Sequence, residues 1–324
     1  MLKVNEVLKY DLDPIPKYLL TRDVMKLDSK SKDLIRAKET VLQSKWVKDI
    51  VKLQWEDGSW GEFHSLSQCD KSLITTEQAL RRLLVLGLDK NDEVIQKALV
   101  YMEKYLRGEL DLRDRKEKKH DWNVVTKLFV ATWILIFDPS NNLAKEIAED
   151  WAKVITHGFS VGEYNHNAYK EAYYEVHKAS KDKHMLGFQS FYLVSILRGM
   201  LSSQIESKFL DYIINSEKGI YYIYEKSLII PPSEFHSKIT SRYVDAHELL
   251  SSYTYSKTKL QYFKSWINNN VSEDGFWDMG NLVKDKIYFP LSDSWRKTIN
   301  RKIDCTIKIQ RILENLKVEG DKNE

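Results

Sequence analysis

Apolar side chains recur along most of this chain at intervals of three and four residues, the spacing that places them on one face of an α-helix. Glycine and proline, which interrupt helices, are few, at 12 and 6 of 324 residues. A single short segment, 220–224, has the composition of a β-strand. The pattern therefore predicts an all-α fold, with helices over residues 16–26, 31–43, 75–86, 92–106, 122–137, 141–157, 163–177, 188–200, 204–215, 241–253, 257–269 and 304–316.

Two kinds of predicted helix alternate along the chain. The segment 122–137 is apolar on nearly all sides and should be buried all round, whereas 92–106 and 141–157 are amphipathic. Glycines follow the amphipathic helices at spacings of 50, 50, 61 and 56 residues, at Gly58, Gly108, Gly158, Gly219 and Gly275. A repeat of this length, with one helix of each kind, indicates a recurring helical hairpin.

We expect five or six of these hairpins to close into an (α/α)5–6 toroid, with amphipathic helices outside and apolar helices inside. Closure removes the exposed ends that an open solenoid must cap, and an open superhelix is the alternative. Because no Pro-, Gly- or Ser-rich linker divides the chain, we predict one domain over residues 1–324.

A short motif accompanies the repeat. Segment 54–60, Gln-Trp-Glu-Asp-Gly-Ser-Trp, fits the pattern Gln-x-x-x-Gly-x-Trp; segment 271–277 shares its Glu-Asp-Gly-x-Trp part, and 215–221 is a degraded copy. The glycine is expected to make a tight turn and the indole to pack back over the end of the preceding helix. These segments resemble the Gln–Trp repeats of squalene–hopene cyclases and the related repeats of protein prenyltransferase β subunits. The resemblance implies a terpenoid-cyclase-like or prenyltransferase-like toroid, closest to bacterial single-toroid members.

Composition narrows the class of partner. Lys and Arg total 50 against 47 Asp and Glu, so the chain is near neutral and we expect no nucleic-acid partner. The 18 Tyr and 9 Trp suggest an aromatic-lined cavity, with Tyr-rich helix packing as the alternative.

Two cysteines, Cys69 and Cys305, cannot build a disulfide framework, which favours a reducing compartment. The longest apolar run, 128–137, is shorter than the roughly 20 residues of a membrane span. We therefore expect a cytoplasmic location.

The motifs that carry chemistry in the resembling families are missing here. The chain has no Asp-x-Asp-Asp acid cluster and no Asp-Asp-x-x-Asp magnesium motif. Protein prenyltransferases hold zinc through Asp, Cys and His, and Asp304 and Cys305 resemble part of that set, with His247 or His236 as a third ligand. Here, however, the two residues are adjacent, which points them about 100° apart on a helix. We predict no metal and no cofactor; the simpler interpretation is that Asp304 caps a helix and Cys305 packs in the core.

Polar residues at predicted loop–helix junctions face the expected mouth of the toroid. The candidate catalytic residues are Asp121, Glu234 and Asp304. The candidate ligand-binding residues are His120, Trp122, Arg242, Tyr288, Asp293, Trp295 and Arg296. Trp295 with Arg296 is suited to an anionic group such as pyrophosphate or carboxylate. The alternatives are that Asp121 caps a helix and that 288–296 is a surface lid held by salt bridges of Asp293.

We predict a prenyltransferase-like or terpene-cyclase-like protein with a central apolar, aromatic-lined cavity for an isoprenoid or similar hydrophobic ligand. Whether it is an enzyme is left open. One alternative is a non-catalytic toroid that binds a small molecule or a protein and has a plugged or shallow centre. The other is a carbohydrate-active α/α barrel enzyme, which needs two carboxylates about 5–10 Å apart; Asp121 and Glu234, or Asp293, are the candidates.

Overall fold

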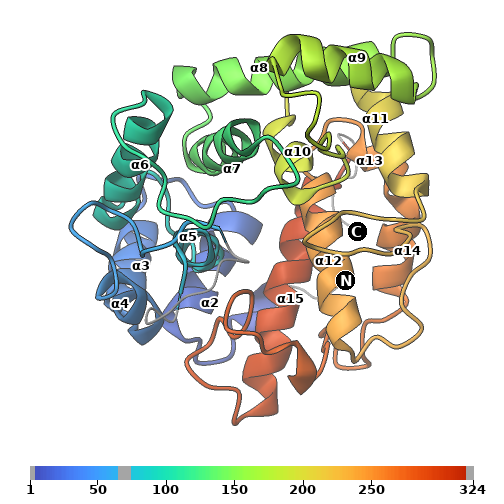
Figure 1. The fold of residues 1–324 in the computed structure, drawn as a ribbon. Helices are drawn as coiled ribbons and strands as arrows, with labels where there is room; N and C mark the ends of the chain where they lie inside the picture. The colour runs from blue at the N-terminus through green and yellow to red at the C-terminus, as the bar shows by residue number, and fades with distance from the viewer. Residues whose placement is uncertain (1–3, 65–73, 319–324) are drawn as a thin grey trace.

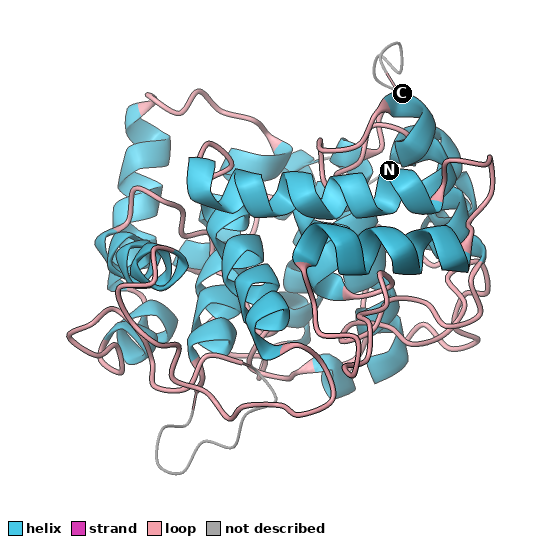
Figure 2. Cartoon of the chain, turned by 45° about the horizontal axis from the view of Figure 1, so that its top comes forward, coloured by secondary structure: helices cyan, strands magenta, loops and turns pink. Residues whose placement is uncertain are grey.

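Helices make up all the regular structure in the part of the chain that is described. The computed structural model describes residues 4–64 and 74–318, and within them it contains helices joined by loops and no strand (Figure 1, Figure 2). The all-α prediction is therefore confirmed. Segment 220–224 is a tight turn closed on itself, because the amide of Ile220 donates to the carbonyl of Tyr224 at 2.7 Å. Cys69 lies outside the described residues.

In chain order the helices are α1 (Val4–Val7), α2 (Pro14–Leu19), the π-helical turn η1 (Leu20–Val24), α3 (Lys32–Gln43), α4 (Lys45–Val51), α5 (Thr76–Val85), α6 (Glu93–Leu106), α7 (Trp122–Phe137), α8 (Asn142–Gly158), α9 (His166–His177), α10 (Phe191–Ile196), α11 (Ser203–Asn215), α12 (Lys238–Leu250), α13 (Ser256–Lys259), α14 (Gln261–Asn268), the 3-10 turn η2 (Asn281–Val283) and α15 (Thr298–Asn315).

Most predicted helices are present with differences at their ends, but the single helix predicted over 257–269 is divided into α13 and α14 at Leu260. Helix α7 has the predicted bounds, whereas α10 is shorter than expected because the chain turns at Gly199, which has φ +70°. Helix α15 begins at Thr298, six residues before the predicted start at Asp304. Its N-cap, Lys297, makes no side-chain capping bond, so the sequence carries no start signal there.

Burial distinguishes the two kinds of helix as predicted. Most of α7 is buried, including Trp133 in its interior, whereas α8 buries one face around Trp151. Figure 1 shows α7, α10, α12 and α15 toward the middle of the view, with α6, α8, α9, α11 and α14 around them. Helix α7 contacts α10, α10 contacts α12 and α12 contacts α15, and α15 packs on α2 and η1 at the other end of the chain.

The two best copies of the Gly-x-Trp motif adopt the same hydrogen-bonded structure. In each, the indole N–H donates to the carbonyl ten residues earlier, at 2.9 and 2.8 Å, and the tryptophan amide donates to a threonine hydroxyl of the next long helix, at 2.9 and 3.0 Å. The matched sets are Trp60 with Ile50 and Thr76, and Trp277 with Ile267 and Thr306. Each motif thus ties the end of one helix to another helix, at the start of α5 in the first copy and within α15 in the second.

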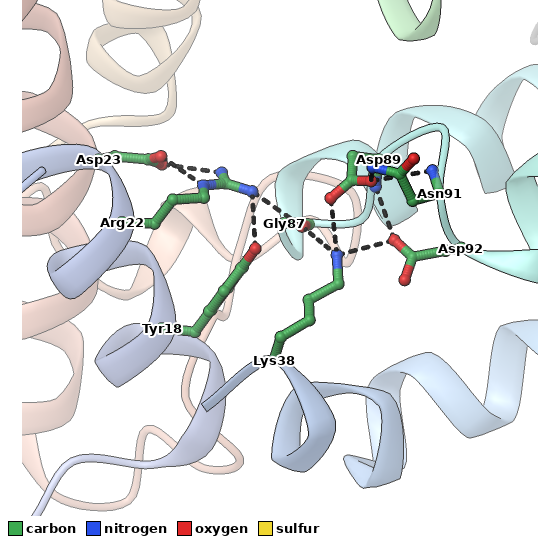
Figure 3. Close-up of polar contacts among 8 residues, drawn as sticks. All are labelled: Tyr18, Arg22, Asp23, Lys38, Gly87, Asp89, Asn91 and Asp92. Carbon is green, nitrogen blue, oxygen red and sulfur yellow. Dashed lines mark hydrogen bonds and ion pairs between the residues drawn. The ribbon is translucent and has the colours of Figure 1, made fainter. Parts of the chain in front are cut away.

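The C-terminus of α5 is held by cations from two other elements (Figure 3). The carbonyl of Gly87 accepts from the Arg22 guanidinium and from the Lys38 ammonium, each at 2.9 Å. Lys38 also pairs with Asp89 at 3.1 Å and Asp92 at 2.7 Å. Positive charge at a helix C-terminus satisfies its free carbonyls and opposes its negative dipole end. This junction joins α5 to η1, α3 and the loop that leads to α6.

Replacing Gly87 with alanine should destabilise the fold. Gly87 has φ +93°, and an added Cβ would lie 2.9 Å from the ring of Tyr18, which Arg22 and Lys38 cover. We expect Gly87→Ala to lower the free energy of unfolding by about 2–4 kcal/mol, from backbone strain and overpacking together. Urea denaturation followed by circular dichroism measures the change.

The control is Gly108→Ala, because Gly108 also has positive φ, +74°, but has no atom within 4 Å of an added Cβ. It should cost only about 1 kcal/mol. Equal losses in the two variants would show that the contact with Tyr18 does not matter.

Candidate functional site

A cavity of about 1130 Å³ opens between segments that are far apart in the sequence. Its lining comes from His64 before α5, from the loop 114–120, from the first half of α7, from 186–192 and from the turn 217–225. This volume is slightly above the roughly 300–1,000 Å³ common for small-molecule sites. This cavity, with its aromatic and charged lining, forms the candidate site.

Stacked rings form one wall of the cavity. Phe129 of α7 stacks on Tyr192 of α10 with ring centroids 4.0 Å apart, and it also stacks on His64 at 4.7 Å. Tyr222 presents its edge to His64 and to Tyr192, at 5.4 and 5.5 Å. The remaining apolar lining includes Trp122, Val125, Leu128 and Leu186. This wall suits an apolar or planar ligand body.

The outer part of the cavity is charged. Acidic and basic side chains alternate there, from two loops: Asp114, Arg115, Glu117 and Lys119 on one side and Glu217, Lys218 and Glu225 on the other. Glu117 already pairs with His120, whose Nδ1 lies 2.6 Å from its carboxylate. The arrangement, apolar inside and charged outside, can hold a molecule with a hydrophobic body and a polar end.

Below the aromatic wall lies a buried carboxylate, Glu77, whose side chain has no exposed area. It accepts from the Tyr192 hydroxyl at 2.6 Å, from the Trp133 indole at 3.1 Å and from His64 Nδ1 at 3.1 Å. Arg81 lies 3.4 Å away. Burial alone would raise the pKa of Glu77, but the hydrogen bond from His64 and the charge of Arg81 outweigh it and lower the pKa to about 2. Glu77 is therefore an anion over the physiological range.

Backbone hydrogen bonds position both members of the Glu77–His64 pair. Glu77 lies in the first turn of α5, which begins with a capping box between Thr75 and Gln78. The amide of Glu77 donates to the carbonyl of Phe63 at 3.0 Å, and the amide of His64 donates to the carboxylate of Asp114 at 2.7 Å. The segment that carries His64 is thus tied to the start of α5 and to the loop 114–120.

Two of the predicted ligand-binding residues, His120 and Trp122, line this cavity. Asp121, between them, caps α7 by accepting from the amides of Asn123 and Val124 at 3.1 and 3.3 Å. Its other carboxylate oxygen accepts from the amide of Ser180 at 3.2 Å. The capping interpretation of Asp121 is therefore confirmed.

The loop between η2 and α15, residues 284–297 and called the late loop below, lies elsewhere and is anchored on α15 and α5. Asp304 is fully buried in α15 and accepts four hydrogen bonds, from the amides of Leu291 and Ser292, the Ser292 hydroxyl and the Trp295 indole, at 2.6–2.9 Å. Burial raises the pKa of Asp304 to about 6, although these donors oppose the rise. Asp304 caps no helix, because α15 begins earlier, whereas Cys305 is buried in the core as expected.

The same loop places Tyr288 against α5 and α15. Its hydroxyl accepts from Arg81 at 2.8 Å, and the Lys308 ammonium lies over its ring, 4.8 Å from the centroid. Arg82 donates to the carbonyls of Ile287 and Pro290. Neither Tyr288 nor Trp295 lines the large cavity.

The remaining predicted residues are dispersed. Glu234 is exposed beside a smaller pocket of about 470 Å³. Asp293 and Arg296 are exposed on the late loop, and Arg242 lies 3.8 Å from Asp285. Neither Asp121 nor Glu234 nor Asp293 lines the large cavity, so the carboxylate pairs expected for a carbohydrate-active enzyme do not face each other across it.

The residues that the sequence alone did not single out are His64, Glu77 and Tyr192. A signal existed for one of them: Glu77 and Arg81 lie one helical turn apart on α5, on the side of Leu80 and Leu84, where apolar residues are expected. A charged pair on that face points to a buried ionic contact. His64 and Tyr192 carried no comparable signal, because their contacts join residues 128 positions apart.

Asp304→Asn should weaken the attachment of the late loop. An amide oxygen cannot accept all four hydrogen bonds, so donors are left unsatisfied and the free energy of unfolding should fall by about 1–3 kcal/mol. Asp293→Asn is the control, since that side chain is exposed, and it should stay within about 0.5 kcal/mol of the parent. Chemical denaturation measures both. An unchanged stability in Asp304→Asn would contradict the anchoring role.

Residues 4–64 and 74–318 contain neither a metal-binding cluster of side chains nor a membrane-spanning helix. No group of three or more His, Cys, Asp and Glu side chains is arranged to hold a metal ion. None of the helices in these two ranges is both long enough and apolar enough to cross a membrane.

No protein-family model, curated protein or solved structure matches this chain.

Proposed function

We propose that this chain binds a hydrophobic small molecule of isoprenoid-like character in the large cavity, with the apolar body on the aromatic wall and a polar end at the charged outer part. The observation that carries the proposal is the stack of Phe129, Tyr192 and His64 lining a cavity of about 1130 Å³. Burial of apolar ligand surface against such a wall contributes roughly 25 cal/mol per Å² before the costs of association.

We also propose that the helices form a closed double ring of the terpenoid-cyclase-like or prenyltransferase-like kind. Three observations support this. Amphipathic and buried helices alternate along the chain, α15 packs on α2 and η1, and the motifs at Trp60 and Trp277 make equivalent hydrogen bonds. A ring of this kind leaves a space at its middle, where the inner helices face one another.

One observation favours the alternative of a non-catalytic toroid with a plugged centre. Tyr288 and Phe289 of the late loop pack among the inner helices, close to Arg81 and Lys308. They fill space that an isoprenoid chain would otherwise occupy. The large cavity is lined by other segments, so the two features coexist, and ligand binding decides between the proposals.

The test is a titration of the purified protein with farnesol and with farnesyl pyrophosphate, followed by tryptophan fluorescence, because Trp122 lines the cavity. Saturable binding of either is expected. Leu186→Arg should weaken it at least tenfold, since a charge on the apolar lining costs about 1.4 kcal/mol or more when the ligand covers it.

The matched control is Leu282→Arg. Leu282 is 73% exposed on η2 and does not line the cavity, so this variant should bind like the parent. If neither compound binds, or if both variants bind equally well, the cavity is not the site of a hydrophobic ligand.

A further inference from the structure

The hydrogen bonds around His64 determine which of its ring nitrogens carries a proton. Tyr192 has one hydroxyl proton, which it donates to Glu77 at 2.6 Å. Glu77 is a carboxylate with lone pairs only, and it lies 3.1 Å from His64 Nδ1. Nδ1 must therefore be the donor in that contact, and in the neutral ring the lone pair lies on Nε2.

The other edge of the ring is open to the cavity. Within the described residues, His64 Nε2 makes no hydrogen bond. It is also not one of the fully buried side-chain atoms that lack a partner, so it keeps some exposed area. The His64 side chain is 12% exposed and lines the cavity. Stacking on Phe129 and the contact with Glu77 hold the ring in one orientation. A basic nitrogen of fixed direction thus faces the space in which a ligand would lie.

We propose that this cavity is a catalytic site for the hydrolysis of hydrophobic carboxylic esters, in which His64 is the general base and Glu77 positions it. The inference rests on the proposed function, because the ester must bind on the aromatic wall. An imidazole is too weak a base to take a proton from an unactivated hydrocarbon, but it can take one from water as the water attacks a carbonyl carbon. The apolar wall selects an ester with a hydrophobic group.

Hydrolysis of the ester needs no reactant other than water. The water oxygen bonds to the ester carbonyl carbon while one of its protons passes to His64 Nε2. The bond from that carbon to the alcohol oxygen then breaks, and the departing oxygen takes the proton from the imidazolium. The products are a carboxylic acid and an alcohol, and His64 returns to its starting state. Glu77, directly hydrogen-bonded to Nδ1, stabilises the imidazolium while it exists.

The experiment is hydrolysis of p-nitrophenyl decanoate by the full chain, with release of nitrophenolate measured by absorbance. We expect turnover above the buffer rate, and His64→Ala should lower kcat by about 100-fold or more. Added imidazole should restore part of the rate in His64→Ala, because the small base can enter the space that the side chain leaves. His157→Ala, at an exposed position of α8, is the control and should keep the parent rate.

A second set of variants tests the positioning role of Glu77. Glu77→Gln keeps an acceptor for Nδ1 but removes the charge, and it should lower kcat in the parent while leaving KM similar. In the His64→Ala background the same change should have no further effect, because Glu77 acts through His64. A merely structural role would lower the rate in both backgrounds, and circular dichroism checks that each variant folds.

Binding of decyl p-nitrophenyl ether, which cannot be hydrolysed, separates this inference from the proposed function. Binding of the ether without turnover of the ester would overturn the catalytic inference and leave ligand binding intact. Absence of both would overturn both. Turnover that persists in His64→Ala, or a defect in that variant that imidazole does not repair, would also overturn the role of His64.

Discussion

The buried charge of Glu77 is the constraint on which the centre of this molecule depends. A carboxylate removed from water is stable only when donors and cations surround it, because an unpaired buried charge costs several kcal/mol. Here the partners come from separate elements: Trp133 from α7, Tyr192 from α10 and His64 from the segment before α5. Satisfying one carboxylate therefore fixes how three parts of the chain meet.

That requirement also shapes the cavity. Tyr192 and His64 are held at Glu77 by their polar atoms, so their ring faces are left to stack with Phe129. The same contacts that neutralise the buried charge thus build the aromatic wall and aim Nε2 of His64 outward. In this way the interaction that joins α5 to α7 and α10 also supplies the chemistry that we propose for the cavity.

On the far side of Glu77, a second network continues through Arg81. Its guanidinium bonds to Tyr288, whose ring lies beneath Lys308, and Lys308 pairs with Asp245 at 2.6 Å and Glu248 at 2.9 Å. Asp304 anchors the loop that brings Tyr288 there. The late loop is long enough to reach α5 and α15, where Tyr288 and Trp295 make buried contacts, and neither residue lines the large cavity.

The sequence alone determined the helical class, the alternation of buried and amphipathic helices and the turns at the Gly-x-Trp motifs, because these follow from the spacing of apolar residues and from local backbone geometry. It placed His120 and Trp122 near the cavity through their position before the most apolar helix. Only the tertiary structure decided which polar residues meet. His64, Glu77 and Tyr192 lie up to 128 positions apart, and Asp304, which lies inside α15, finds its hydrogen-bond partners only in the loop folded onto that helix. The spacing of apolar residues shows which face of a helix is buried, but packing between helices determines the partner of a buried polar group.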